Sequence, residues 1–269
     1  MPKYSVITPA YIFNEERAEL FKKCIESVNR LDYDHTQYQH LIVNDGSPYP
    51  FDLPAYPHIK VINQNNLQRI TAYNKGLEAS TGDIILFLDS DDEFERNTLS
   101  SIDKAFKKYP KYKMFNFGST MLYTDGKEAL RDPFMPKKRK VGHEVFGGGN
   151  IVNGTFVFKR EVYEDLGGFM PELVANIDCT VLNYPAYSGQ EKPYIRNLIA
   201  TSPYDFSAYM QLKYPEIQKY FMVKHPDHPT TLVRELGNPY GQDYALFYAY
   251  TRKYHSKPVK EYLLRVHLK

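Results

Sequence analysis

One stretch in the first half constrains the fold of this 269-residue chain more than any other. The apolar run Ile84–Leu88 leads directly into Asp89-Ser90-Asp91-Asp92-Glu93, in which four of five residues are acidic. A short, unbroken apolar run is typical of a strand buried on both faces, as in parallel sheets. Ligands of open α/β sheets bind beyond the carboxyl ends of the strands, so these acidic residues are candidates for a binding site.

The chemistry of this acidic segment allows two interpretations. Clustered carboxylates repel one another unless a cation or a donor-rich ligand lies among them. Ligand sets made only of oxygen atoms suit Mg²⁺ or Mn²⁺. The alternative is a solvated acidic turn before a helix, with Asp92 or Glu93 near the helix N-terminus. The segment taken alone does not decide between them.

The first half alternates between strand-like apolar runs and amphipathic helices. We expect helices from about residue 15 and around residues 70–77, and strands at residues 4–8, 40–44, 59–62 and 83–88. Strands and helices that alternate at this spacing predict an α/β fold, with βαβ units and a mostly parallel sheet flanked by helices.

The second half follows a different pattern. Asp125-Gly126 is typical of a hairpin turn after a strand at residues 114–123. We further expect a strand at residues 151–158, a short helix at 161–166, a helix at 241–254 and a last element at 262–268. Residues 174–239 lack clean periodicity and are predicted to form an inserted lobe with a few short helices.

Composition narrows the class of protein. A net charge of +2 gives no global electrostatic argument for nucleic acid binding. Two cysteines, Cys24 and Cys179, form neither a disulfide framework nor a zinc motif, and Cys24 lies on the apolar face of a predicted helix. No run approaches the roughly 18 apolar residues of a membrane span, and no signal peptide pattern follows Lys3. We therefore expect a soluble, cytoplasmic protein.

Four motifs occur in a fixed order, each near the end of a predicted strand or helix. They are Val6–Tyr11 with Asn14-Glu15, Ile42–Ser47, Asn74–Ala79 leading to Gly82-Asp83, and Phe87–Asp92. Each motif is weak alone, but four in this order are specific, and the chain resembles the inverting family 2 glycosyltransferases of the GT-A fold. The resemblance is tight over residues 3 to about 100 and resumes at residues 154–169, 241–243 and 265–267.

The resemblance implies a pocket for the uracil base of a UDP-sugar donor. Asp45 would accept the imide N–H of uracil, although an Asx turn with the two following residues is an alternative role. Thr8, Pro9 and Tyr11 would form the floor and the stacking wall of the base pocket. Glu15 is expected to cap the following helix rather than reach the ribose.

The resemblance also implies a Mn²⁺ or Mg²⁺ ion. Asp89 and Asp91 match the family's Asp-X-Asp motif, with Asp91 on an ion that bridges the diphosphate and Asp89 nearer the ribose or the donor sugar. We place Ser90, between them, in the donor site. His267, in a C-terminal Arg-x-His pattern, would be a further metal ligand or diphosphate contact, and Arg69 would contact the diphosphate. The ion would neutralise charge on the UDP leaving group.

The catalytic base is predicted to be Asp243. The family has a Glu-Asp pair opening a late helix, and here the pair reads Gln242-Asp243, so the aspartate is kept. Inversion requires the acceptor hydroxyl on the face opposite the leaving group, where this carboxylate would take its proton. The alternative role is that of a first-turn acid that complements the helix dipole.

Two departures from the family pattern affect the interpretation. The family often has a glycine and an Arg-Asn pair before the fourth strand, where this chain has Gln68 and Tyr73-Asn74. The stretch at about 174–239 is longer than the family's spacer and is expected to shape the acceptor pocket. We predict one continuous GT-A domain, with a nucleotide-sugar-binding half at residues 1–110 and an acceptor-binding half at residues 111–269.

The predicted function is metal-dependent, inverting transfer of a sugar from a UDP-sugar to a hydroxyl acceptor. A glycan or lipid-linked glycan is the default acceptor, and the basic run Lys137–Lys140 allows a modified base in DNA instead. A nucleotidyltransferase would need a Gly-rich phosphate loop where Pro9–Phe13 stands. A third alternative is a UDP-sugar- or glycan-binding module without turnover, which Gln242 supports and the retained aspartates oppose.

Overall fold

The computed structural model of the chain describes residues 2–53, 55–65, 69–133, 153–166, 254 and 256–268. All of these residues belong to one compact unit, which comprises Met1–Met135, Val152–Gly167 and Tyr254–Lys269. The predicted lobe at 174–239, the helix at 241–254 and the basic run Lys137–Lys140 lie outside the described residues, except for residue 254.

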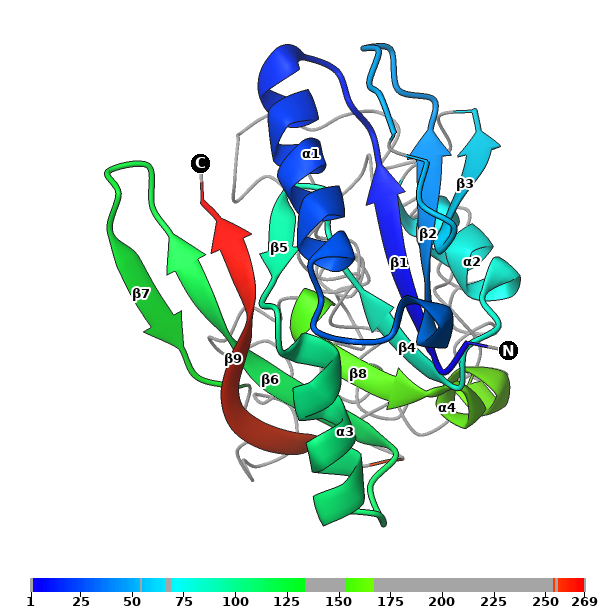
Figure 1. The fold of residues 1–269 in the computed structure, drawn as a ribbon, viewed down its shortest axis with the longest axis vertical. Helices are drawn as coiled ribbons and strands as arrows, with labels where there is room; N and C mark the ends of the chain where they lie inside the picture. The colour runs from blue at the N-terminus through cyan, green and yellow to red at the C-terminus, as the bar shows by residue number, and fades with distance from the viewer. Residues whose placement is uncertain are drawn as a thin grey trace, which may run out of the picture. The chain divides into compact units, whose positions relative to one another are not determined.

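A nine-stranded sheet is the frame of the described part (Figure 1). Its strands lie in the order β3-β2-β1-β4-β8-β6-β9-β5, and β7 pairs with β6. The strands are β1 Tyr4–Ala10, β2 Tyr38–Asp45, β3 Ile59–Gln64, β4 Ile84–Phe87, β5 Asp92–Phe94, β6 Met114–Leu122, β7 Glu128–Arg131, β8 Phe156–Lys159 and β9 Lys257–His267.

The sheet is mostly parallel, as predicted. Strands β1 to β4, β6 and β9 run in one direction, whereas β5, β7 and β8 run in the other. The antiparallel β6–β7 hairpin turns at Asp125-Gly126, where Gly126 has a φ of 82° in the left-handed region, and this confirms the predicted turn. The predicted α/β fold with a mostly parallel sheet flanked by helices is confirmed, whereas the division at residue 110 stays a prediction.

Helices cover both faces of the sheet. Figure 1 shows α1 and α3 on one face and α2 on the other. The helices are α1 Glu15–Asn29, α2 Arg69–Ala79, α3 Thr98–Lys108 and α4 Arg160–Leu166, with short 3-10 turns at His35–Gln37 and Asn153–Thr155. The first helix begins after Asn14, whose Oδ1 accepts the Arg17 N–H at 2.9 Å, so the prediction that Glu15 caps this helix is wrong.

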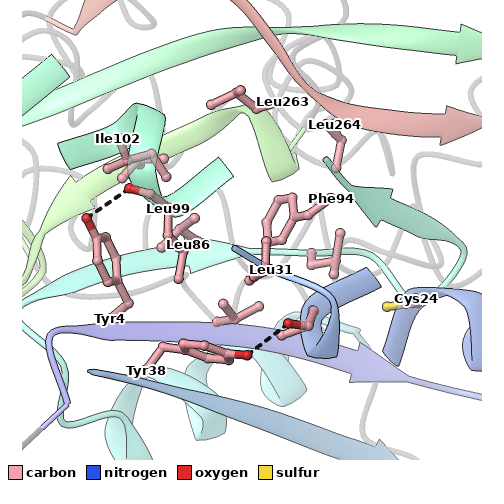
Figure 2. Packing of buried hydrophobic residues seen from close by; sticks show 14 of the residues in the cluster. Tyr4, Cys24, Leu31, Tyr38, Leu86, Phe94, Leu99, Ile102, Leu263 and Leu264 are labelled. Carbon is pink, nitrogen blue, oxygen red and sulfur yellow. Dashed lines mark hydrogen bonds between the residues drawn. The ribbon is translucent and has the colours of Figure 1, made fainter. Parts of the chain in front are cut away.

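The main hydrophobic core lies between the sheet and the helices α1 and α3 (Figure 2). Cys24 on α1 and Leu99 on α3 pack into one cluster with Tyr4 and Leu86 from the central strands. The Tyr4 hydroxyl lies 3.4 Å from the Leu99 carbonyl and donates over a shorter distance to Oδ1 of Asp103, so this polar atom at the border of the core is satisfied. Cys24 is fully buried, as predicted, and burial raises the pKa of its thiol well above the usual range.

Two motif glycines allow close backbone packing around β1. A Cβ atom at Gly76 would lie 2.3 Å from Cγ2 of Ile7, so only glycine lets α2 approach the sheet this closely. A Cβ atom at Gly82 would lie 2.5 Å from the carbonyl carbon of Tyr4. These two contacts explain the glycines of the third motif by packing.

The acidic segment differs from its predicted local structure. Asp92–Phe94 form the short strand β5, which pairs antiparallel with β9, and α3 does not begin until Thr98. The interpretation of a solvated turn with Asp92 near a helix N-terminus is therefore wrong. No helix among the described residues has the length and apolar character needed to cross a membrane.

Candidate active site

The sheet brings three of the predicted site segments to one edge. Strand β1 lies between β2 and β4 and runs parallel to both, with Ala10 opposite Asn44 and Ile7 opposite Phe87. The residues that follow these strands therefore leave the sheet side by side. Tyr11, Asp45 and the acidic segment meet there, as the motifs predict.

Asp45 is the last residue of β2 and is only 4% exposed. Its Oδ1 accepts a hydrogen bond from Nε2 of Gln64 at 2.7 Å. The turn that follows is held by Asn44, whose Oδ1 accepts the Ser47 N–H at 3.0 Å, and Gly46 there has a φ of 72°. Asn44 thus holds the turn beside Asp45 through a bond three residues along the chain, and the base contact of Asp45 stays a prediction.

The predicted base-pocket residues, of which Thr8 and Pro9 lie in β1 and Tyr11 follows it, are buried to different depths. Thr8 and Pro9 are buried, whereas the Tyr11 ring is 41% exposed. Thr8 Oγ1 lies 2.9 Å from Nε2 of His40, so this hydroxyl is bonded inside the sheet. Phe13, a residue the sequence did not single out, is 49% exposed beside Tyr11. An aromatic ledge of Tyr11 and Phe13 therefore borders the candidate site.

His40, the partner of Thr8, makes the stability of the folded protein sensitive to acid. It is fully buried, and burial lowers the pKa of His40 from an ordinary 6.5 to about 3. Because the pKa of the folded state lies below that of the unfolded chain, stability is complete above pH 6.5 and falls as the pH drops toward 3. We expect His40 to remove about 2 kcal/mol of unfolding free energy between pH 7 and pH 5.

Urea unfolding at pH 7 and pH 5 tests this expectation, with His40→Gln as the comparison. Burial also lowers the pKa of His58, to about 4, so His58 contributes to acid sensitivity in both proteins. The difference between the parent chain and the variant in the free energy lost on acidification gives the contribution of His40. Equal losses on acidification in the two proteins would show that His40 does not set the acid limit.

Asp89, the first aspartate of the Asp-X-Asp motif, is held by Tyr73. The Tyr73 side chain is fully buried in α2, and its hydroxyl donates to Oδ1 of Asp89. Tyr73 stands where the family often has arginine, so a neutral donor contacts Asp89 at this position. Ser90, next along the chain, is half-buried.

Asp91, the second aspartate of the motif, forms an ion pair with Arg17. The distance between Nη1 of Arg17 and Oδ2 of Asp91 is 2.6 Å, and the two side chains are 23% and 24% exposed. Arg17 lies in the first turns of α1, far from Asp91 in the sequence. The motif comparison gave no signal for this pair, because it depends on how α1 packs against β5, the strand that follows Asp91.

His267 joins the far end of the acidic segment. Its backbone N–H donates to Oδ1 of Asp92 at 3.3 Å, and its Nε2 lies 2.9 Å from Oε1 of Glu93. Nη2 of Arg30 donates to the other oxygen of Glu93 at 3.1 Å. Burial, with the nearby charges of Asp89 and Asp91, raises the pKa of Asp92 well above its usual range.

The predicted metal ligands are not gathered around one point in the described part of the chain. No group of three histidine, cysteine, aspartate or glutamate side chains among the described residues is placed to hold an ion. Asp89 bonds Tyr73, Asp91 bonds Arg17 and His267 bonds Glu93. Two carboxylates separated by a single residue, Asp89 and Asp91, nevertheless fit Mg²⁺ or Mn²⁺, because such ions often take one or two carboxylates plus substrate phosphates.

Of two other predicted site residues, one is placed only in part and one lies outside the described residues. Arg69 is the first residue of α2, and its side chain lies outside the described residues, as does the whole of Asp243. The metal ligands, the base and the diphosphate contact therefore stay predictions.

Comparison with known proteins gives the family. The sequence model of the family described as Glycosyl transferase family 2 matches residues 5–167, more than half of the chain. The chain is 33% identical over 97 residues to the uncharacterized glycosyltransferase YibD of Escherichia coli (strain K12), covering 34% of this chain and 26% of YibD. It is 25% identical over 173 residues to the amylovoran biosynthesis glycosyltransferase AmsB of Erwinia amylovora, covering 59% of this chain and 56% of AmsB.

Among solved structures, a crystal structure of S. aureus TarS 1-349 aligns over 93% of this chain and 91% of that solved chain, at 15% identity and a TM-score of 0.49. The chain spans 26% of YibD and 56% of AmsB, so it covers only part of each of these two curated relatives. The family match begins at the second residue of β1 and includes the acidic segment. The chain belongs to glycosyl transferase family 2.

Proposed function

We propose that this chain transfers a sugar from a UDP-sugar to a hydroxyl acceptor, with inversion and with the help of Mn²⁺ or Mg²⁺. The observation that carries the proposal is the position of buried Asp45 and the half-buried Asp89 and Asp91 on either side of β1, at one edge of the sheet. The sheet then holds, in one rigid arrangement, the carboxylate proposed to recognise the base and the two carboxylates proposed to face the diphosphate.

Asp45 and Tyr11 are the proposed base contacts. A carboxylate has room for several hydrogen bonds, so the bond from Gln64 to Oδ1 still allows Asp45 to accept the imide N–H of uracil. Cytosine lacks that N–H and would be refused. The exposed ring of Tyr11 offers a face on which the base can stack.

Asp89 and Asp91 are the proposed ligands of the divalent ion, with His267 as a further ligand. When bound, the ion supplies Lewis-acid stabilisation of the charge on the departing diphosphate. Because Glu93 engages Nε2 of His267, Nδ1 is the ring nitrogen proposed for the ion. Glu93 then fixes the tautomer of His267, as carboxylates near metal-bound histidines commonly do.

Asp243 is the proposed general base, and the acceptor is proposed to be a glycan or a lipid-linked glycan. The carboxylate would take the proton of the acceptor hydroxyl as that oxygen attacks the anomeric carbon and the bond to UDP breaks. The acceptor class rests on the family alone.

Release of UDP from a panel of UDP-sugars tests the proposal, in the presence of Mn²⁺ and with or without glycan acceptors. We expect acceptor-stimulated release with at least one donor, and loss of release with a chelator. Binding of UDP-sugars without any release would favour the module without turnover instead.

Asp45→Ala should weaken uridine nucleotides far more than it lowers stability. Loss of one charge-assisted hydrogen bond costs about 1.5–3 kcal/mol, or roughly ten- to 150-fold in affinity. Calorimetry with UDP and CDP measures the effect, and CDP affinity should hardly change. Asn44→Ala is the matched control, since it removes the turn bond to Ser47 and should not discriminate between the nucleotides. Equal losses for UDP and CDP in Asp45→Ala would leave Asp45 with a structural role only.

A further inference from the structure

Arg17 reaches from α1 to the carboxylate that is proposed to bind the divalent ion. Its Nη1 donates to Oδ2 of Asp91 at 2.6 Å, a short, charge-assisted bond. Its Nε atom is buried and has no hydrogen-bond partner among the described residues. Its guanidinium carbon lies 5.6 Å from the centre of the Phe13 ring, close enough for a cation–π contact. The guanidinium is thus held between Asp91 and the aromatic ledge.

This position conflicts with an ion on the same carboxylate. A guanidinium nitrogen 2.6 Å from Oδ2 of Asp91 and a divalent ion at the usual ligand distance of about 2 Å would repel each other in a partly buried site. Both side chains are about a quarter exposed, at 23% and 24%, so water screens this repulsion only in part. Ligation through Oδ1 alone leaves this repulsion in place, so an ion binds Asp91 best when the pair with Arg17 breaks or rearranges.

We propose that Arg17 is an internal competitor of the divalent ion at Asp91. The guanidinium neutralises Asp91 in the ion-free chain and leaves Oδ2 when the ion binds. This inference rests on the proposed metal dependence of the donor site and adds a residue that sets its metal affinity. It makes Arg17 a positioning residue, because it acts through Asp91.

The surroundings of Arg17 favour an exchange rather than a fixed pair. The Phe13 ring is 49% exposed and offers a cation–π contact that does not depend on Asp91. The unpartnered Nε means that the present position leaves one donor of the guanidinium unsatisfied. A nucleotide diphosphate beside the ion supplies acceptors for the released guanidinium, so UDP and the ion should each strengthen the binding of the other.

Mn²⁺ titrations followed by the electron paramagnetic resonance signal of free Mn²⁺ test this inference without any turnover. In the absence of nucleotide, Arg17→Gln should tighten Mn²⁺ binding by about tenfold or more, because the competing bond is lost. Arg17→Lys keeps the competing charge and should bind Mn²⁺ within about threefold of the parent chain. In Arg17→Gln, the gain in Mn²⁺ affinity caused by UDP should also shrink.

Arg30→Gln is the matched control for the loss of one positive charge. Arg30 caps the same helix and bonds a different acidic residue, Glu93, at 3.1 Å. Its replacement should change Mn²⁺ affinity by less than about twofold, since Arg30 bonds one oxygen of Glu93 while the other keeps its contact with His267, and the guanidinium is more than half exposed. Far-ultraviolet circular dichroism melts of all three variants verify that each is folded.

The outcomes separate this inference from the proposed function. An unchanged or weaker Mn²⁺ affinity in Arg17→Gln, or a change equal to that of Arg30→Gln, would overturn the competitor role. Absence of Mn²⁺ binding in the parent and in Arg17→Gln, with UDP release that persists in a chelator, overturns the inference and the metal dependence while sugar transfer stands. Tighter Mn²⁺ binding in Arg17→Gln without consumption of any UDP-sugar supports the inference and refutes the transfer.

Discussion

Asp243→Asn should lower turnover by about 10²–10⁴-fold, the share of a rate that general base catalysis commonly supplies. Asparagine keeps the size of the side chain and its ability to begin a helix, but it does not accept the proton of an acceptor hydroxyl. Affinity for the UDP-sugar should hardly change, because the proposed donor residues other than His267 lie within the first hundred residues. Acceptor affinity should also change little, since the amide still hydrogen-bonds a hydroxyl.

Steady-state rates of UDP release, with donor binding measured separately by calorimetry, examine this expectation. Gln242→Glu is the neighbouring control and should keep activity within a factor of ten, because the base is already present at Asp243. Near-normal transfer by Asp243→Asn would mean that the base lies elsewhere. Asp178, Asp205 and Asp227 would then be tested in turn.

Asp91→Ala should abolish metal-dependent binding of UDP-sugars while the protein stays folded. The variant removes the carboxylate that Arg17 holds at 2.6 Å, and with it the main proposed ligand of the ion. The lost ion pair should cost at most about 1 kcal/mol of unfolding free energy, because both side chains are partly solvated. Calorimetric titration of UDP in Mn²⁺ and in a chelator measures the loss of metal-dependent affinity.

Glu95→Gln is the control for the removal of a nearby negative charge. Glu95 lies four positions beyond Asp91 and pairs with Arg265 at 3.4 Å, outside the proposed ligand set. Its replacement should leave UDP and Mn²⁺ affinity within about twofold. Unchanged UDP and Mn²⁺ affinities in Asp91→Ala would remove Asp91 from the site, whatever the rate of transfer.

The sequence predicts those parts of the fold that are set by local pattern. Strands β1 to β4 and helix α1 follow from apolar periodicity, and the β6–β7 hairpin follows from Asp125-Gly126. The sequence pattern does not predict β5, because this strand has only three residues and two of them are charged. No alternation of apolar and polar residues is visible over so short a segment. Its strand geometry comes from pairing with β9, about 170 residues later, which no local pattern encodes.

The sequence predicts those site residues that directly follow a strand. It does not predict contacts that depend on how helices and strands pack together. The motifs place Asp45 and the acidic segment at strand ends, and the register of β1 with β2 and β4 brings both to the same end of the sheet. They did not indicate that Asn44 holds the turn beside Asp45, because either residue type forms it. The Arg17 contact depends on how α1 packs against the sheet. That packing is set by the side chains of the hydrophobic core and not by any motif.

The pairing of β5 with β9 also orders events during synthesis of the chain. Asp92 lies opposite Val266 and Phe94 opposite Leu264, so the acidic segment has no strand partner until these late residues have left the ribosome. Strands β1 to β4 lie within the first 87 residues and can pair much earlier. A nascent chain therefore acquires the proposed uracil contact first, and the strand that follows Asp89 and Asp91 gains its partner only when β9 has left the ribosome.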